Sequence, residues 1–183
     1  PFAGSGLSSA RLAEGSVRVA TGLFGGCDRL ASVEVPGTVT SVGDRAFQGC
    51  TSLPAALEVP ASVATLGSFA YEGCSQLASV ALPPSLGRVG TGAFRGCSSL
   101  ASVDLPPSVS FVDNGAFEGC SSLSSVTLPE GLRGLGRSVF RGCPLAFVTV
   151  PASLESTEGW RWGDGPFAGS GLSSARLAEG SVR

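Results

Sequence analysis

Apolar and polar residues recur along the chain in fixed columns, at intervals of 22 to 27 residues. Each interval holds an aromatic residue, a glycine two positions later, and then a short segment in which polar and apolar residues alternate. The segment from Ser102 to Leu105 shows this alternation, which is typical of a half-buried β-strand with its β-branched residue pointing inward. The pattern therefore predicts one short strand in every interval.

The aromatic column sets the period of the repeat. Its members are Phe2, Phe24, Phe47, Tyr71, Phe94, Phe117, Phe140 and Phe167. A proline such as Pro106 follows most of the strand segments, and proline ends a strand because it cannot donate a ladder hydrogen bond. The glycine-bearing segment between strands is expected to be a compact return.

One interval cannot fold alone, because burying its few apolar side chains does not offset the entropy lost in ordering its backbone. Consecutive units must therefore stack, with their strands paired in parallel about 4.8 Å apart. We expect residues 1–183 to form a single continuous solenoid, with coils that start near residues 2, 24, 47, 71, 94, 117, 140 and 167.

The segment "LASVDLPPSVSFVDNGAFEGCSSL" (100–123) resembles the BspA-type leucine-rich repeat. The resemblance implies a leucine-rich-repeat solenoid, mostly β and turn, in which each coil has a short parallel β-strand and a compact return. It also implies a parallel sheet on the concave face. Proteins with such repeats occur on the surface of bacteria and some protists, or are secreted, so the resemblance implies an extracellular or cell-surface location, adhesion and protein binding. The asparagine ladder of other leucine-rich repeats is missing, and Ala10 and Ala13 depart from the pattern of the inner units.

A second, longer period joins the two ends of the sequence. Residues 166–183 repeat residues 1–18 at all 18 positions, whereas neighbouring inner repeats differ at many positions. Either the natural protein is a tandem array of 165-residue blocks, or the ends were built to match. We favour the tandem array, because no polar cap is visible at either end. The sequence begins at Pro1 without an initiator methionine, so we expect it to be processed or cut from a longer chain.

The composition narrows the possible partners. Charged residues make up 14% of the chain and the net charge is -2, so no basic surface is expected to attract nucleic acid. No run of 18 apolar residues occurs, which argues against membrane insertion. The expected partner is protein: further copies of the chain, giving a homopolymer or part of a longer chain, or a host or surface protein.

The cysteines occupy one position per coil. They are Cys27, Cys50, Cys74, Cys97, Cys120 and Cys143, with serine at the same position in the outer two units. Stacked coils would bring neighbouring cysteines within disulfide range, but their side-chain directions are parallel and do not converge. We interpret the column as a structural ladder of buried thiols. Because the chain has no histidine and no CxxC pair, we expect no metal site and no cofactor.

Catalytic chemistry finds little support in the sequence. Ser-His-Asp and Cys-His catalysis require a histidine, and no glycine-rich phosphate loop is present. Acidic residues are scattered and never form a recurring pair. We therefore predict no catalytic residues and a protein that is not an enzyme.

The outward strand positions form the candidate binding face, which is small and weakly charged. It comprises Ser9, Arg11, Ser32, Glu34, Glu58, Ser79, Ser102, Asp104, Ser125, Thr127, Phe147 and Thr149. These residues either form the solvated side of a sheet or pack against another sheet or a flat ligand.

The interval between Phe140 and Phe167 is the longest and carries both tryptophans of the chain. Trp160, Arg161 and Trp162 either form a contact loop for a partner or cover an exposed edge of the solenoid.

Two functions are compatible with these features. The leading hypothesis is a non-enzymatic structural protein, a segment of a long tandem-repeat extracellular fibre or surface layer. The alternative is a surface adhesin that recognises a protein or a glycan.

Overall fold

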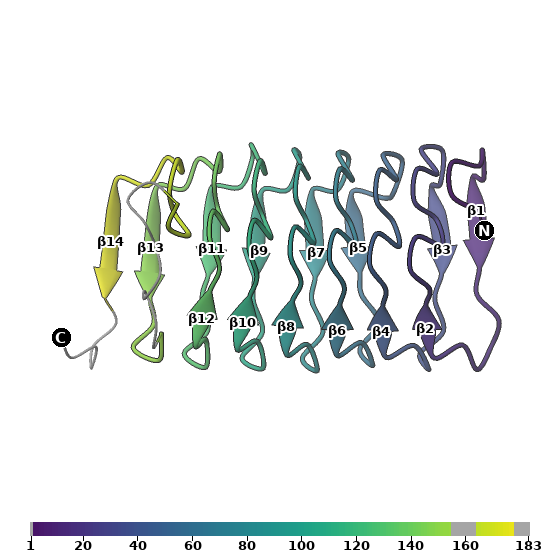
Figure 1. Ribbon diagram of the computed structural model, residues 1–183, viewed down its shortest axis with the longest axis horizontal. Helices are drawn as coiled ribbons and strands as arrows, with labels where there is room; N and C mark the ends of the chain where they lie inside the picture. The colour runs from purple at the N-terminus through teal and green to yellow at the C-terminus, as the bar shows by residue number, and fades with distance from the viewer. Residues whose placement is uncertain (1, 155–163, 178–183) are drawn as a thin grey trace.

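The chain folds into an elongated stack of coils with its two ends far apart (Figure 1). The computed structural model describes residues 2–154 and 164–177. We number the coils 1 to 8 by the aromatic residue at which each begins, from Phe2 to Phe167. The predicted parallel solenoid of short strands and turns is confirmed, and the described residues contain no helix.

A first row of strands occupies the positions predicted from the alternating segments. These strands are β1 (Ser9–Arg11), β3 (Ser32–Glu34), β5 (Ala56–Glu58), β7 (Ser79–Ala81), β9 (Ser102–Asp104), β11 (Ser125–Thr127), β13 (Phe147–Val150) and β14 (Ser174–Leu177). They pair in parallel and in register as β1–β3, β5–β7, β9–β11 and β13–β14. The middle residue of each three-residue strand faces the interior and its two neighbours face outward.

A second row of strands lies within the segments that the sequence predicted as returns. These two-residue strands are β2 (Arg18–Val19), β4 (Ser41–Val42), β6 (Thr65–Leu66), β8 (Arg88–Val89), β10 (Phe111–Val112) and β12 (Gly134–Leu135). They form one continuous six-stranded parallel sheet, in which the second residue of every strand is buried. The strands of the two rows run in opposite directions (Figure 1). Each of the first six coils therefore contains one strand of each row and makes one full turn of the solenoid.

The aromatic column forms a continuous ring stack through the core. Neighbouring rings have centroids 5.1 to 6.1 Å apart and are nearly parallel, with interplanar angles of 3 to 19°. Each inner ring packs between those of the coils before and after it, so an inner coil buries its ring against both neighbours.

The glycine two positions after each aromatic has a geometric role. All eight adopt a left-handed backbone with φ between 67 and 75°. This conformation is unfavourable for any residue that has a Cβ atom. Here the backbone turns, and the amide of the glycine bonds to the next coil, as in Gly49 N to Glu72 O at 2.7 Å. The turns therefore add a third ladder of hydrogen bonds to the two rows of strands.

Candidate interaction surfaces

The first row carries all of the residues predicted as the binding face. The twelve residues are exposed, and strand register aligns them in columns, such as Ser102 beside Ser125 and Asp104 beside Thr127. Polar contacts cross between coils: Thr127 Oγ1 donates to Asp104 Oδ1 at 2.9 Å, and Arg11 pairs with Glu34. The hydrogen bond from Arg11 lowers the pKa of the Glu34 carboxyl. The structure thus assembles this surface, and its role in binding stays a prediction.

One part of this surface is apolar and hollow. Phe147 on β13 is 49% exposed, and it borders a hollow of about 310 Å³ between β11 and β13. The polar side chains of Ser125, Thr127 and Thr149 line the same hollow. An exposed aromatic beside hydroxyl groups is a suitable contact for a partner, because the ring supplies area and the hydroxyls supply hydrogen bonds.

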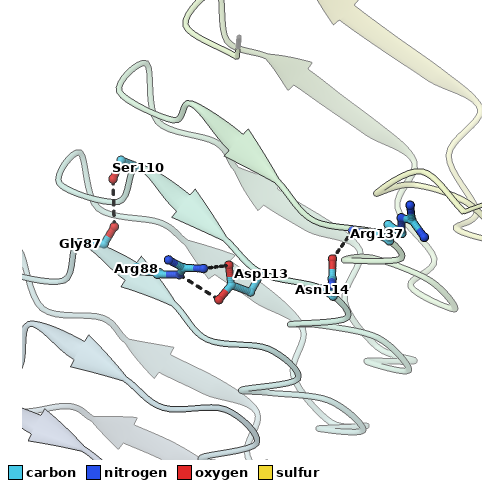
Figure 2. A network of polar contacts seen from close by, with 6 residues as sticks. All are labelled: Gly87, Arg88, Ser110, Asp113, Asn114 and Arg137. Carbon is cyan, nitrogen blue, oxygen red and sulfur yellow. Dashed lines mark hydrogen bonds and ion pairs between the residues drawn. The ribbon is translucent and has the colours of Figure 1, made fainter. Parts of the chain in front are cut away.

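The outward side of the second row holds a cluster that the sequence interpretation missed. Arg88, Phe111 and Gly134 lie in register on β8, β10 and β12. The guanidinium carbon of Arg88 lies 6.0 Å from the centroid of the Phe111 ring, within the range of a cation–π contact. The same guanidinium donates two hydrogen bonds of 2.9 and 2.8 Å to the carboxylate of Asp113 (Figure 2).

Glycine makes room for the Phe111 ring. A Cβ atom on Gly134 would lie 2.8 Å from a ring carbon of Phe111, closer than any side chain tolerates. Phe111 nevertheless stays 45% exposed. The arginine, phenylalanine and glycine of three successive coils thus form one unit on the surface.

The same unit occurs a second time, beside the turns that follow the second row. The guanidinium carbon of Arg45 lies 5.1 Å from the centroid of the Phe69 ring, and a Cβ atom on Gly92 would lie 2.6 Å from that ring. Arg45 and Phe69 adopt φ values of 54 and 60°, which side chains rarely adopt. The second unit borders a hollow of about 240 Å³, which Arg95, Glu118 and others line.

Side-chain oxygens partly replace the missing asparagine ladder. Asn114 Oδ1 accepts a hydrogen bond from Arg137 N at 2.8 Å, and Asp44 Oδ1 accepts one from Ser68 N at 2.8 Å. Figure 2 shows the Asn114 contact together with the bond from the Ser110 hydroxyl to Gly87 O, at 3.2 Å. Each bond joins one coil to the next, so these polar groups hold coils together at the surface.

The six cysteine side chains lie in the core and form no disulfide. Each thiol donates to the backbone carbonyl of the aromatic residue in the preceding coil, at 3.0 to 3.2 Å. Burial raises the pKa of Cys50 and of Cys97 to about 12, and it raises the pKa of Cys74 as well. The thiols of Cys50, Cys74 and Cys97 are therefore protonated near neutral pH, which makes them poor nucleophiles.

Three further predictions concern the contact loop, metal ligands and membrane-spanning segments. The contact loop of Trp160, Arg161 and Trp162 lies outside the described residues. Within residues 2–154 and 164–177, no cluster of three or more potential metal ligands occurs. The same part of the chain holds no helix of the length and hydropathy that a membrane span needs.

Comparison with known proteins agrees with the fold. The sequence profile described as "BspA type Leucine rich repeat region (6 copies)" matches residues 1–56 and 54–161. A search of curated proteins gave no match.

Three solved structures illustrate the likeness. A leucine-rich repeat protein of T. pallidum is 33% identical, with a TM-score of 0.67 over 74% of this chain and 76% of that one. A leucine-rich repeat protein of Bacteroides ovatus is 22% identical, with a TM-score of 0.65, and the match covers 80% of this chain and 44% of that protein. The pneumococcal vaccine antigen PcpA is 16% identical, with a TM-score of 0.61 over 97% of this chain and 58% of that one. The last two show a common fold alone.

Proposed function

The chain belongs to the BspA-type leucine-rich repeat family, and from that premise we propose that it is a structural scaffold assembled from tandem 165-residue blocks. In this proposal the protein has no enzymatic activity and works outside the cell, in a fibre or surface layer held together by contacts between proteins.

One observation carries the proposal. Residues 1–18 and 166–183 are identical, and the described parts of both segments stack as regular coils at opposite ends of the molecule. Their turn glycines, Gly4 and Gly169, have φ values of 68 and 67°. A block that starts the same sequence again in the same conformation continues the stack without a break.

The mass of the native polypeptide tests the scaffold. We expect a chain well above the 18.2 kDa of these 183 residues, with a length that grows in steps of 165 residues. Mass spectrometry of the isolated native protein measures this directly. A mature polypeptide of about one block would refute the tandem arrangement.

A second candidate function rests on Phe147 and the hollow beside it. We propose as the alternative that the first row binds a protein or a glycan as an adhesin, with Thr127 and Thr149 giving hydrogen bonds around the ring. The test compares Phe147→Ser with the control Phe111→Ser, because the two rings are 49% and 45% exposed on different rows. Loss of ligand binding in Phe147→Ser alone favours an adhesin, and a parallel variant of Trp160 and Trp162 tests the contact loop.

A further inference from the structure

The first row of strands opens between β3 and β5. The Cα atoms of these two strands lie more than 8 Å apart, whereas β7 approaches β9, and β11 approaches β13, within that distance. Figure 1 shows β5 closer to its partner β7 than to β3. The opening is confined to one side of the solenoid, because β4 and β6 of the same two coils stay paired.

The sequence of coil 3 explains the opening. In coil 2, the residue after the column leucine donates its amide to the coil before it, from Ala31 N to Ser8 O at 2.8 Å. In coil 3 the residue at this position is Pro54, which has no amide hydrogen to donate. Coil 3 also carries one extra residue here, since four positions separate Leu53 from Leu57, against three in coil 2. Proline and the extra residue together separate the two strands.

A hollow of about 160 Å³ lies in this opening. Its walls are largely apolar and include Val33 of β3, Pro54, and Leu57 of β5. On its inner side the hollow reaches the ring stack, where it is lined by Phe47 and Tyr71, each only 3% exposed. Because an apolar cavity of about 150 Å³ binds benzene, this hollow has room for one aromatic ring.

Tyr71 brings a buried polar atom to the inner side of the hollow. It is the only tyrosine of the chain and stands where the other seven coils have phenylalanine. Its ring lies parallel to that of Phe47, with centroids 5.1 Å apart and an interplanar angle of 8°, so its hydroxyl extends from an otherwise apolar column.

The Tyr71 hydroxyl lacks a protein partner. Among residues 2–154 and 164–177, no hydrogen bond satisfies it. Burial raises the pKa of Tyr71, so the hydroxyl is protonated at neutral pH and able to donate. A buried hydroxyl without a partner is unfavourable, and a ligand that supplies an acceptor therefore gains affinity.

Glu58 gives the hollow a negative charge. This residue of β5 is exposed and lines the hollow. Within the described part of the chain Glu58 belongs to no ion pair, whereas Glu34 on β3 pairs with Arg11. No basic side chain of the described residues lines the hollow. The carboxylate therefore favours a ligand that carries a positive group at its solvent-facing end.

We propose that the hollow binds a small phenolic amine, that is, one aromatic ring with a hydroxyl group at one end and a protonated amine at the other. The ring packs between Val33 and Leu57, its hydroxyl oxygen accepts a hydrogen bond from Tyr71, and its ammonium group pairs with Glu58. This binding site goes beyond the scaffold and adhesin functions. It lies entirely within coils 2 to 4, so it is the same in a single block and in a tandem array.

Calorimetric titration of the 183-residue protein with tyramine tests the site. We expect saturable binding of one tyramine per chain, with a Kd on the order of 0.1–1 mM for so small a ligand. Two analogues separate the polar contacts, because phenethylamine lacks the phenol hydroxyl and 4-ethylphenol lacks the amine. Each analogue should bind roughly three- to tenfold more weakly than tyramine.

Two conservative variants assign these contacts to residues. Tyr71→Phe removes only the hydroxyl and gives coil 4 the residue found in the other coils, and in this variant tyramine should lose its advantage over phenethylamine. Glu58→Gln should remove the advantage of tyramine over 4-ethylphenol. Asp104→Asn is the matched control, because Asp104 occupies the same strand position on β9, and it should bind all three ligands as wild type does.

Two results overturn the proposal. One is the absence of saturable binding of tyramine to the wild-type protein at concentrations up to about 10 mM. The other is a wild-type ligand preference in either variant: Tyr71→Phe that still prefers tyramine to phenethylamine, or Glu58→Gln that still prefers tyramine to 4-ethylphenol. Circular dichroism of each variant should match that of wild type, so that a change in preference reports on the site.

Discussion

At the position after the turn glycine, the six inner coils have cysteine and the two outer coils have serine. In coil 7, the Cys143 thiol donates to Phe117 O of the coil before it, at 3.1 Å. In coil 8, the Ser170 hydroxyl donates to Phe167 O of its own coil, at 2.7 Å. The thiol links two coils, whereas the hydroxyl at the equivalent position closes a local turn.

The difference shows how a weak donor can help hold a stack together. The carbonyl of Phe24 already accepts the amide of Cys27 in its own coil, and the thiol of Cys50 from the next coil gives it a second donor. Cysteine combines this bond with an apolar side chain that packs in the core. Serine at the block boundary loses both contributions, so we expect the boundary to open before the interior.

Removing an aromatic ring should give the largest difference in stability loss between the inner and the outer coils. Phe117 is fully buried between Phe94 and Phe140, with centroids 5.5 and 5.6 Å away, so Phe117→Ala should lower the free energy of unfolding by about 3–5 kcal/mol. Phe167 is partly exposed, and Phe167→Ala should cost about 1–2 kcal/mol. Urea denaturation measures both values. Equal losses would show that the outer coils are as tightly packed as the inner ones.

Alkaline pH should weaken the inner coils selectively. Burial raises the pKa of Cys50 and Cys97 from 9.0 to about 12, so the folded state keeps these thiols protonated while the unfolded chain ionises. The stability they contribute is complete below pH 9.0 and falls as pH rises toward 12, by about 1.4 kcal/mol per thiol and pH unit.

Urea denaturation at about pH 8 and about pH 10 measures this loss, which amounts to about 3 kcal/mol for the two thiols. Burial raises the pKa of Tyr71 too, and this acts in the same direction. A variant in which Cys50 and Cys97 are serine should lose much less between the two pH values. An unchanged loss would assign the effect to other groups.

Exchanging cysteine and serine between the inner and outer coils should have a smaller effect on stability. Cys97→Ser places a hydroxyl in the core and should cost about 1–2 kcal/mol, although the hydroxyl can still donate to Tyr71 O. Ser170→Cys should stabilise the boundary by at most about 1 kcal/mol, if the new thiol reaches Phe140 O. Hydrogen exchange of the Gly142 amide, which bonds to Gly169 O, reports on the boundary directly. Slower exchange of this amide in Ser170→Cys is the expected result.

Removing a surface ion pair should have the smallest effect on stability, and the effect should be similar in the inner and the outer coils. Arg88→Ala removes a bidentate pair with Asp113 on an inner coil, at an expected cost of about 0.5 kcal/mol. Arg11→Ala removes the pair with Glu34 on an outer coil, and its melting temperature should equal that of wild type. A large effect at either position would mean that surface charges, rather than buried columns, distinguish the regions.

Much of the fold could be predicted because each column repeats in every coil. The alternation around Val103 and the aromatic spacing predicted the first row and the stacked architecture, since both signals recur in all eight coils. The second row was missed because its strands have two residues, which is too short for alternation to be visible. The signal that could have found it is the recurring apolar residue represented by Val42 and Val89.

The surface was harder to predict than the core. The exposed columns of the first row followed from strand geometry, but the contacts of Arg88 with Phe111 and of Arg45 with Phe69 did not. Each of these contacts joins different coils, and its geometry depends on space left by a glycine one coil further on. Pairings of this kind depend on side-chain conformation, which a periodic pattern does not specify.

The ring stack has a genetic consequence. Because every coil meets its neighbours through the same ring stack and the same hydrogen bond from the turn glycine, deleting or duplicating a whole coil leaves the flanking rings facing each other as before. Recombination between misaligned repeats in the gene would then yield shorter or longer proteins that still fold. Length is a property that such a gene can vary freely, whereas a shift of a few residues within one coil would misplace its ring.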